Sequence, residues 1–167
     1  MHDSAYQFVK ECCRRIRTPI GRCIEVGSLN VNGSARDHIV AGEYIGIDMI
    51  AGCGVDIVGD FMLLDLPDAD VIVSTEALEH YHDQAGFVRR LAGIAKRGCA
   101  LILTCAAPDR GAHSCDGGQL HDGEFYRNPD PQHVLMWLMT CGWRIVIFDH
   151  DKSAGDLRVM AFYEPAD

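Results

Sequence analysis

The stretch that decides the fold is CIEVGSLNVNGS at residues 23–34, where a short apolar run ends in a loop that contains two glycines. A short apolar run bounded by a turn signal predicts a buried strand. Glycine after such a strand permits the tight turn that leads into the next element. In open α/β sheets ligands bind beyond the carboxyl ends of the strands, so residues 27–33 are the first candidate for a ligand-binding loop.

Further apolar runs alternate with helical patterns along the chain. Strands are expected at residues 23–27, 44–49, 55–59, 70–74, 99–105, 143–149 and 157–163. Helices are expected at residues 3–17, 34–42, 83–98 and 131–142, the last two ending at Gly98 and Gly142. This alternation predicts an α/β, Rossmann-like three-layer sandwich with a mostly parallel seven-stranded sheet. Residues 150–156 leave no room for a helix, so the last two strands are expected to form an antiparallel hairpin.

Length and charge limit the class of protein. The chain has 167 residues, of which 48% are hydrophobic and 23% are charged, so we expect one domain over residues 1–167 with an N-terminal helix within residues 1–19. With 15 basic and 24 acidic residues the formal net charge is −9. Such a field repels nucleic acid and acidic membrane surfaces, so neither is an expected partner.

The cysteines and the apolar runs indicate a compartment. The eight cysteines form no CxxC pair and lie mostly in apolar runs, which is typical of reduced thiols in a cytoplasmic protein. No apolar stretch approaches the ~20 residues of a membrane-spanning helix. The first residues lack the character of a signal peptide.

The loop at 27–33 can be tested against known phosphate-binding loops. A P-loop requires a lysine at the start of the helix, and this loop has none; a dinucleotide fingerprint requires glycine where Leu29 stands. Glu25 at the mouth of the loop would repel a pyrophosphate and suits an ammonium group. Asp48 ends the second strand, where an acidic side chain can hold both hydroxyls of a ribose. The residues therefore favour an adenosine-like ligand without phosphates.

This combination of an acidic residue, a glycine loop and further acids after strands two and three resembles the class I S-adenosylmethionine-dependent methyltransferases, in particular small, single-domain, methyltransferase type 11-like members. The resemblance runs from about residue 20 to residue 165. It implies that Glu25 lies near the methionine ammonium, that Gly27 lets the backbone approach the cofactor, that Asp48 binds the ribose and that Asp60 meets the adenine amino group. The common G-x-G core of the family is replaced here by GSLNVNG. The cofactor-binding residues expected on this basis are Glu25, Gly27, Ser28, Gly33, Asp48, Met49, Asp60, Phe61, Thr75 and Glu76.

A second motif, TEALEH at residues 75–80, follows the fourth strand. If it is helical, Glu76, Glu79 and His80 stand at i, i+3 and i+4 and share one face. The pattern resembles the E-x-x-E-H arrangement of ubiquinone-pathway O-methyltransferases and small-RNA 3′-terminal 2′-O-methyltransferases, where it binds a divalent cation. The resemblance implies a site for Mg²⁺, Mn²⁺ or Zn²⁺ formed by Glu76, Glu79 and His80. The loop after the fifth strand offers His113, or alternatively His121, as a further ligand. The alternative is that the helix dipole alone favours the glutamates and that His80 is a general base.

The segment at residues 107–131 is too long and too polar for a simple connection, and loops of this kind commonly hold substrate. The candidates for contact with a methyl acceptor are His113, His121, Phe125, Tyr126 and Asp109. Among them His121 is the second catalytic candidate beside His80.

Three functions are compatible with these features. The first is a methyltransferase that acts on an oxygen of a small-molecule acceptor. The second is a catalytically silent S-adenosylmethionine-binding subunit of a complex, and the third, disfavoured by Glu25 and by the loop spacing, is a nicotinamide-dependent oxidoreductase. Because the sequence contains no inserted cap domain, the acceptor site must come from residues 107–131, from the N-terminal helix, or from a second subunit in a homodimer.

Overall fold

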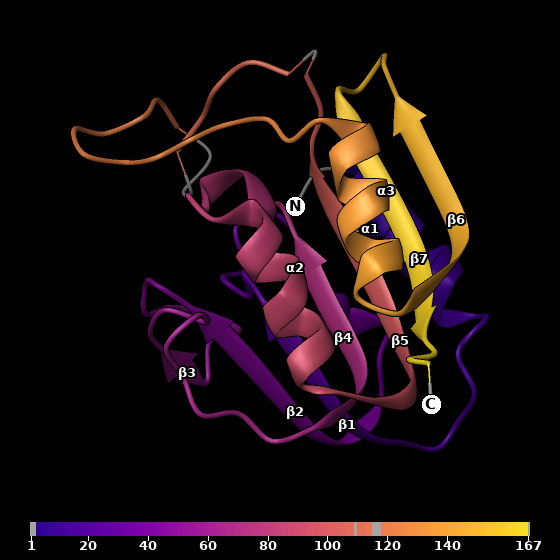
Figure 1. Cartoon of the computed structure of the whole chain (residues 1–167). Coiled ribbons are helices and arrows are strands. Elements are labelled where there is room, and N and C mark those ends of the chain that lie inside the picture. The colour runs from indigo at the N-terminus through magenta and orange to yellow at the C-terminus, as the bar shows by residue number, and fades with distance from the viewer. Residues whose placement is uncertain (1–2, 109, 115–117, 167) are drawn as a thin grey trace.

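The computed structural model describes residues 3–108, 110–114 and 118–166 (Figure 1). The strands are β1 (Ile20–Val26), β2 (Ala41–Asp48), β3 (Ile57–Val58), β4 (Ala69–Thr75), β5 (Ala95–Ala106), β6 (Trp143–Asp151) and β7 (Asp156–Tyr163). The helices are α1 (Asp3–Cys13), α2 (Gln84–Gly93) and α3 (Pro131–Thr140), with 3₁₀ turns η1 (Ala35–Asp37) and η2 (Leu78–His80). None of the helices in the described ranges has the length and apolar character needed to cross a membrane.

The seven strands form one sheet in the order β3-β2-β1-β4-β5-β7-β6. The pairs from β3 to β5 are parallel, whereas β7 runs antiparallel to both β5 and β6. The mostly parallel sheet and the terminal hairpin are therefore confirmed. The strand order reverses between β1 and β4, and Val26 at the end of β1 lies opposite Ile47 on one side and Ser74 on the other. The carboxyl ends of β1, β2 and β4 consequently meet at one edge of the sheet.

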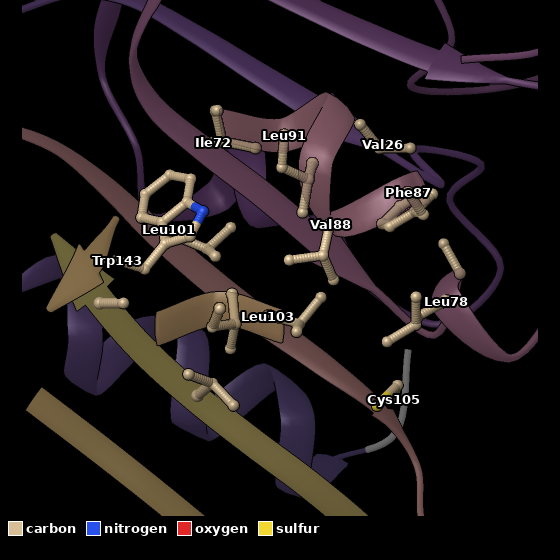
Figure 2. Packing of buried hydrophobic residues seen from close by; sticks show 14 of the residues in the cluster. Val26, Ile72, Leu78, Phe87, Val88, Leu91, Leu101, Leu103, Cys105 and Trp143 are labelled. Carbon is tan, nitrogen blue, oxygen red and sulfur yellow. The ribbon is translucent and has the colours of Figure 1, made fainter. Parts of the chain in front are cut away.

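The sheet separates two apolar layers. Helices α2 and α3 lie side by side over one face, and α1 lies on the opposite face (Figure 1). Under α2 and α3, Leu101 and Leu103 of β5 pack in one cluster with Val88 and Leu91 of α2 (Figure 2). Under α1, a second cluster contains Val9, Cys12, Ile20, Cys23, Val71, Ile102 and Met160. Because the strands are buried on both faces, their sequences read as continuous apolar runs.

Three expected helices are at least four residues shorter than the sequence suggested. The helix predicted at residues 34–42 is only the turn η1, because β2 already begins at Ala41 and leaves too few residues for a packed helix. The Ser34 side chain caps this turn by accepting a hydrogen bond from the Arg36 amide. Likewise α2 ends at Gly93 instead of Gly98, which lies inside β5. Helix α1 ends at Cys13, four residues before the predicted end.

The buried layer under α2 and α3 makes a prediction about stability. Leu101 is fully buried, so Leu101→Ala should leave a cavity and lower the free energy of unfolding by about 2–5 kcal/mol. Leu63 is 84% exposed, so the matched change Leu63→Ala should alter stability by less than about 0.5 kcal/mol. Urea denaturation of both variants measures the difference. Equal effects would contradict the placement of these leucines.

Candidate functional site

A cavity of about 390 Å³ opens at the carboxyl ends of β1, β2 and β4. This is the point where the strand order reverses, the position at which open α/β sheets bind ligands. Its lining consists of Glu25, Val26, Gly27, Ser28, Leu29, Val31, Gly33, Ile47, Asp48, Met49, Ile50, Gly59, Thr75, Glu76, Ala77, His80, Tyr81, Glu124 and Phe125.

Most of the residues predicted to bind a cofactor line this cavity. They are Glu25, Gly27, Ser28, Gly33, Asp48, Met49, Thr75 and Glu76. Asp60 and Phe61 are not in its lining. The Phe61 side chain is fully buried in the core, where its ring meets Phe87 at a centroid distance of 5.2 Å, and the Asp60 carboxylate accepts the Met62 amide at 2.9 Å. In their place Gly59, directly before them, faces the cavity.

The turn after β1 brings main chain to the cavity wall. Gly27 has a φ of +81°, and a Cβ at this position would lie 3.1 Å from Ala77 Cβ and 3.2 Å from the Thr75 carbonyl oxygen. Only glycine fits this conformation and this space without strain. The next residue, Ser28, is 2% exposed, and its hydroxyl has no hydrogen-bond partner in the described part of the chain. A buried hydroxyl in a cavity wall without a partner is suited to a polar group of a ligand.

Asp48 connects two loops around the cavity. Its Oδ2 accepts a hydrogen bond from the Leu29 amide at 3.1 Å, and its Oδ1 accepts one from the Ile50 amide at 3.0 Å. Each carboxylate oxygen has a second lone pair, so the same side chain can also accept from two neighbouring hydroxyls of a ligand.

Glu25 is a buried acid at the end of β1, with 1% of its surface exposed. Burial raises its pKa to about 7, and a hydrogen bond of 2.7 Å from the Tyr44 hydroxyl opposes this rise. Burying a carboxylate is costly unless a cation or hydrogen-bond donors compensate. The Glu25 side chain is therefore suited to bind a positively charged group.

The charges of the cavity all have one sign. Glu25, Asp48, Glu76 and Glu124 line it, and none of the lining residues found among the described ranges is lysine or arginine. An anionic pyrophosphate would be repelled here, whereas a sulfonium or ammonium cation would be attracted.

The TEALEH motif does not form a continuous helix. Glu76 has a φ of +55°, and only Leu78–His80 make a 3₁₀ turn, so the three predicted ligands do not share one helical face. Glu76 accepts from the Thr104 hydroxyl at 2.9 Å and forms an ion pair with Arg110. The structure therefore does not bring Glu76 into a common ligand set with Glu79 and His80, because the left-handed residue turns its carboxylate toward β5.

Three of the four predicted metal ligands do converge. One ligand atom each from Glu79, His80 and His113 lies within 4.8 Å of the others. The Glu79 side chain is fully buried; its Oε1 accepts the Ala106 amide at 2.9 Å and its Oε2 has no partner within the described part. Burial and the neighbouring Glu76 raise the pKa of Glu79 well above its usual range. Two imidazoles and a carboxylate are a ligand set that suits Zn²⁺ or Mn²⁺ once the carboxyl is deprotonated.

The two catalytic candidates have different positions. His80 lines the cavity, and burial together with His113 lowers its pKa, so its ring is neutral near pH 7. His121 is exposed and outside the lining, and its main-chain amide donates to Glu124 Oε2 at 2.9 Å. The structure thus places His80, and not His121, where a reacting group would be bound.

The residues predicted to contact a methyl acceptor also differ in their position relative to the cavity. Phe125 lines the cavity. The Tyr126 ring contacts His80 and His113 at centroid distances of 5.4 and 4.9 Å. Asp109 lies outside the described residues. Sequence reasoning did not find Tyr81 or Glu124 as lining residues, because an isolated tyrosine or glutamate in a loop carries no spacing pattern.

Comparisons with known proteins identify the fold. No protein-family model matches the sequence, and no curated protein is significantly similar to it. Several solved structures have the same fold. The complex of the Haloferax volcanii Trm112 methyltransferase activator with a protein described there as a methyltransferase aligns over 99% of this chain and 92% of the other, with TM-score 0.72 and 16% identity.

Two further structures support this assignment. An S-adenosylmethionine-dependent methyltransferase from Mesorhizobium loti aligns over 91% of this chain and 96% of its own, with TM-score 0.65 and 18% identity. The Burkholderia thailandensis 1,6-didemethyltoxoflavin-N1-methyltransferase, with bound 1,6-didemethyltoxoflavin and S-adenosylhomocysteine, aligns over 95% and 79%, with TM-score 0.69 and 11% identity. The chain therefore has the fold of S-adenosylmethionine-dependent methyltransferases, as the sequence predicted.

The burial of Glu25 predicts a pH-dependent cost in stability. Between its ordinary pKa of 4.5 and its folded pKa of about 7, the folded state retains a proton that the unfolded state has released, so this group lowers stability as pH rises through that window. Glu25→Gln should raise the free energy of unfolding at pH 8 by on the order of 2 kcal/mol, and the gain should shrink toward pH 4.

Urea denaturation at several pH values measures this effect. The control is Glu11→Gln, since the Glu11 side chain is 60% exposed and pairs only with the exposed Arg14 among the described residues. A gain independent of pH, or one equal to that of the control, would contradict the raised pKa of Glu25.

Proposed function

We propose that this protein is an S-adenosylmethionine-dependent methyltransferase that methylates an oxygen atom of a small-molecule acceptor. The observation that carries the proposal is the acid-lined cavity, without lysine or arginine in its described lining, at the switch point of the sheet. S-adenosylmethionine carries a sulfonium, an ammonium and one carboxylate, so its net charge is positive, and it has no phosphate. Its charge therefore matches the cavity, whereas that of a nicotinamide dinucleotide does not.

The lining offers partners for the ribose, the ammonium group and the adenine ring of this cofactor. Asp48 would accept hydrogen bonds from the two ribose hydroxyls, and Glu25 would face the ammonium group. The Ser28 hydroxyl would complete its hydrogen bonding with the cofactor. Met49 and Ile50 are 61% and 42% exposed in the cavity wall, and an adenine ring would cover them. Contact of Asp60 with the adenine amino group stays a prediction.

His80 supplies the acid–base chemistry in this proposal. When bound, S-adenosylmethionine would supply an activated methyl group for transfer to an acceptor oxygen, with the thioether S-adenosylhomocysteine as the leaving group. His80 lines the cavity and is neutral near pH 7, so it can take the proton from an acceptor hydroxyl. The cavity wall aligns the acceptor with the methyl group and keeps water away, which is the main contribution a protein makes to such a displacement.

The proposed role of His80 predicts the kinetics of a variant. His80→Gln should lower kcat by about 10²–10³-fold, because it removes a general base, and should leave S-adenosylhomocysteine affinity within about twofold. In the unmodified protein kcat should fall as pH drops through the lowered pKa of His80, since the protonated ring cannot accept a proton.

The control variant is His133→Gln, an exposed histidine on α3 that stacks on Trp137. S-adenosylhomocysteine release by each variant with a panel of catechol and diol acceptors measures the effect. Activity of His80→Gln equal to that of His133→Gln would exclude His80 as the base.

The convergence of Glu79, His80 and His113 supports a second role for His80 as a ligand of a divalent cation. Such a cation would supply Lewis acidity that lowers the pKa of an acceptor hydroxyl. Binding would release the proton held by Glu79, so affinity would increase with pH.

Removal of metal ions by chelation distinguishes a role of His80 as a general base from a role as a metal ligand. If His80 acts alone, prolonged dialysis against EDTA leaves kcat unchanged within about twofold. If a cation is required, activity is lost and returns with Mn²⁺ or Zn²⁺. In that case Glu79→Gln should abolish metal binding measured by calorimetry, and Glu76→Gln, outside the converging set, should retain it.

A catalytically silent cofactor-binding subunit is the second candidate function. The observation that bears on it is that one similar structure is a complex with a methyltransferase activator, so a partner chain has a precedent for this fold. Such a subunit would bind S-adenosylhomocysteine yet form no methylated product with any acceptor, alone or in its complex. Turnover by the isolated chain excludes it.

A further inference from the structure

We propose that Tyr44 is a positioning residue, which aims Glu25 at the amino group of the cofactor and thereby selects ligands that carry this cation. The inference rests on the proposed S-adenosylmethionine site and adds to it a residue from the neighbouring strand. Tyr44 does not line the cavity, so it would act through Glu25.

The register of the sheet brings the two side chains together. In the parallel pairing of β1 with β2, Tyr44 lies opposite Cys23 and Gly46 lies opposite Glu25. Because side chains two residues apart share a face, Tyr44 and Asp48 are the two side chains on β2 that lie diagonally to Glu25, and of these only the tyrosine can donate a hydrogen bond to a carboxylate. Its hydroxyl donates to Glu25 Oε2 at 2.7 Å. This bond fixes one carboxylate oxygen and orients the other toward further partners.

The surroundings of Glu25 leave its charge incompletely compensated. Among the described residues, the cation that acts on this pair is Arg36, whose guanidinium lies 4.2 Å from the centre of the Tyr44 ring and forms an ion pair with Asp56. No ion pair of Glu25 occurs among the described residues. The carboxylate therefore has a hydrogen-bond donor that favours its charged form and, within the described part of the chain, no ion-pair partner. A ligand ammonium is the group that this arrangement would attract.

Each element around Glu25 contributes to its ionisation. Burial raises its pKa to about 7, whereas the Tyr44 hydroxyl on β2, a main-chain hydrogen bond with Ala35 and the charge of Arg36 on η1 lower it. The Cys23 thiol on β1 stays protonated because burial raises its pKa far above neutrality. Without the Tyr44 hydroxyl the pKa of Glu25 rises, and at neutral pH fewer molecules hold the charged carboxylate.

The test compares two ligands that differ in the amino-acid moiety. S-adenosylhomocysteine carries the ammonium and the carboxylate of the amino-acid moiety, and 5′-methylthioadenosine has the same thioadenosine without either group. In Tyr44→Phe the affinity for S-adenosylhomocysteine at pH 7 should fall about tenfold, the usual size of a lost hydrogen bond to a charged group. The affinity for 5′-methylthioadenosine should change less than about twofold. Calorimetry at several pH values should show that S-adenosylhomocysteine affinity falls as pH is lowered from 8.5 to 6. In the variant this fall should occur at a higher pH than in the unmodified protein.

Controls separate positioning from a structural effect. Tyr163→Phe removes a hydroxyl at the far end of β7 and should leave the affinities for both ligands unchanged. Glu25→Gln should reduce the preference for S-adenosylhomocysteine over 5′-methylthioadenosine, as Tyr44→Phe does. An equal loss of affinity for both ligands in Tyr44→Phe, or no loss of affinity for either, would overturn the inference and leave the proposed cofactor unaffected. Failure of the unmodified protein to bind either ligand would overturn the proposed function itself.

Discussion

The parallel pairing of β1 with both β2 and β4 is the constraint on which the rest of the site depends. It places Val26 beside Ile47 and Ser74, so the loops after three strands leave the sheet at one point. The Gly27 and Ser28 amides then donate to the Ile47 carbonyl at 2.9 and 3.0 Å. The Asp48 carboxylate binds the loops on both of its sides. Reversal of strand order at the same point opens the cavity that these loops surround.

The chemistry of this cavity has a cost in stability. Glu25 and Glu79 are almost completely buried, and burial raises the pKa of each above its ordinary value. A glutamine at either position would remove the cost of burying a charge, so packing alone does not explain these acids. Glu25 lines the cavity, and Glu79 lies beside His80, which also lines it. Local features that oppose stability and gather around one site are typical of functional sites. The left-handed conformation of Glu76 beside the same cavity is a further example.

The strands and the cavity residues at their carboxyl ends could be predicted from the sequence, whereas the helices and the part of residues 107–131 in the cavity could be predicted only in part. Buried parallel strands appear as apolar runs, and residues at their carboxyl ends, such as Glu25 and Asp48, must then lie together. Spacing cannot reveal a left-handed residue, so Glu76 was assigned to a helical face that does not form. Phe61 follows an acidic residue near the site, yet its side chain turns into the core. Contacts such as Tyr44 with Glu25 depend on strand register, which one sequence does not specify.

The measurement that tests the central claim most directly is calorimetric titration of the purified protein with S-adenosylmethionine and, separately, with NADH. The account predicts micromolar binding of S-adenosylmethionine, no binding of NADH, and loss of S-adenosylmethionine binding in Asp48→Ala, because that carboxylate is proposed to hold the ribose. Circular dichroism of the variant would verify that it folds. Binding of NADH without binding of S-adenosylmethionine would contradict the account and assign the acid-lined cavity to another ligand.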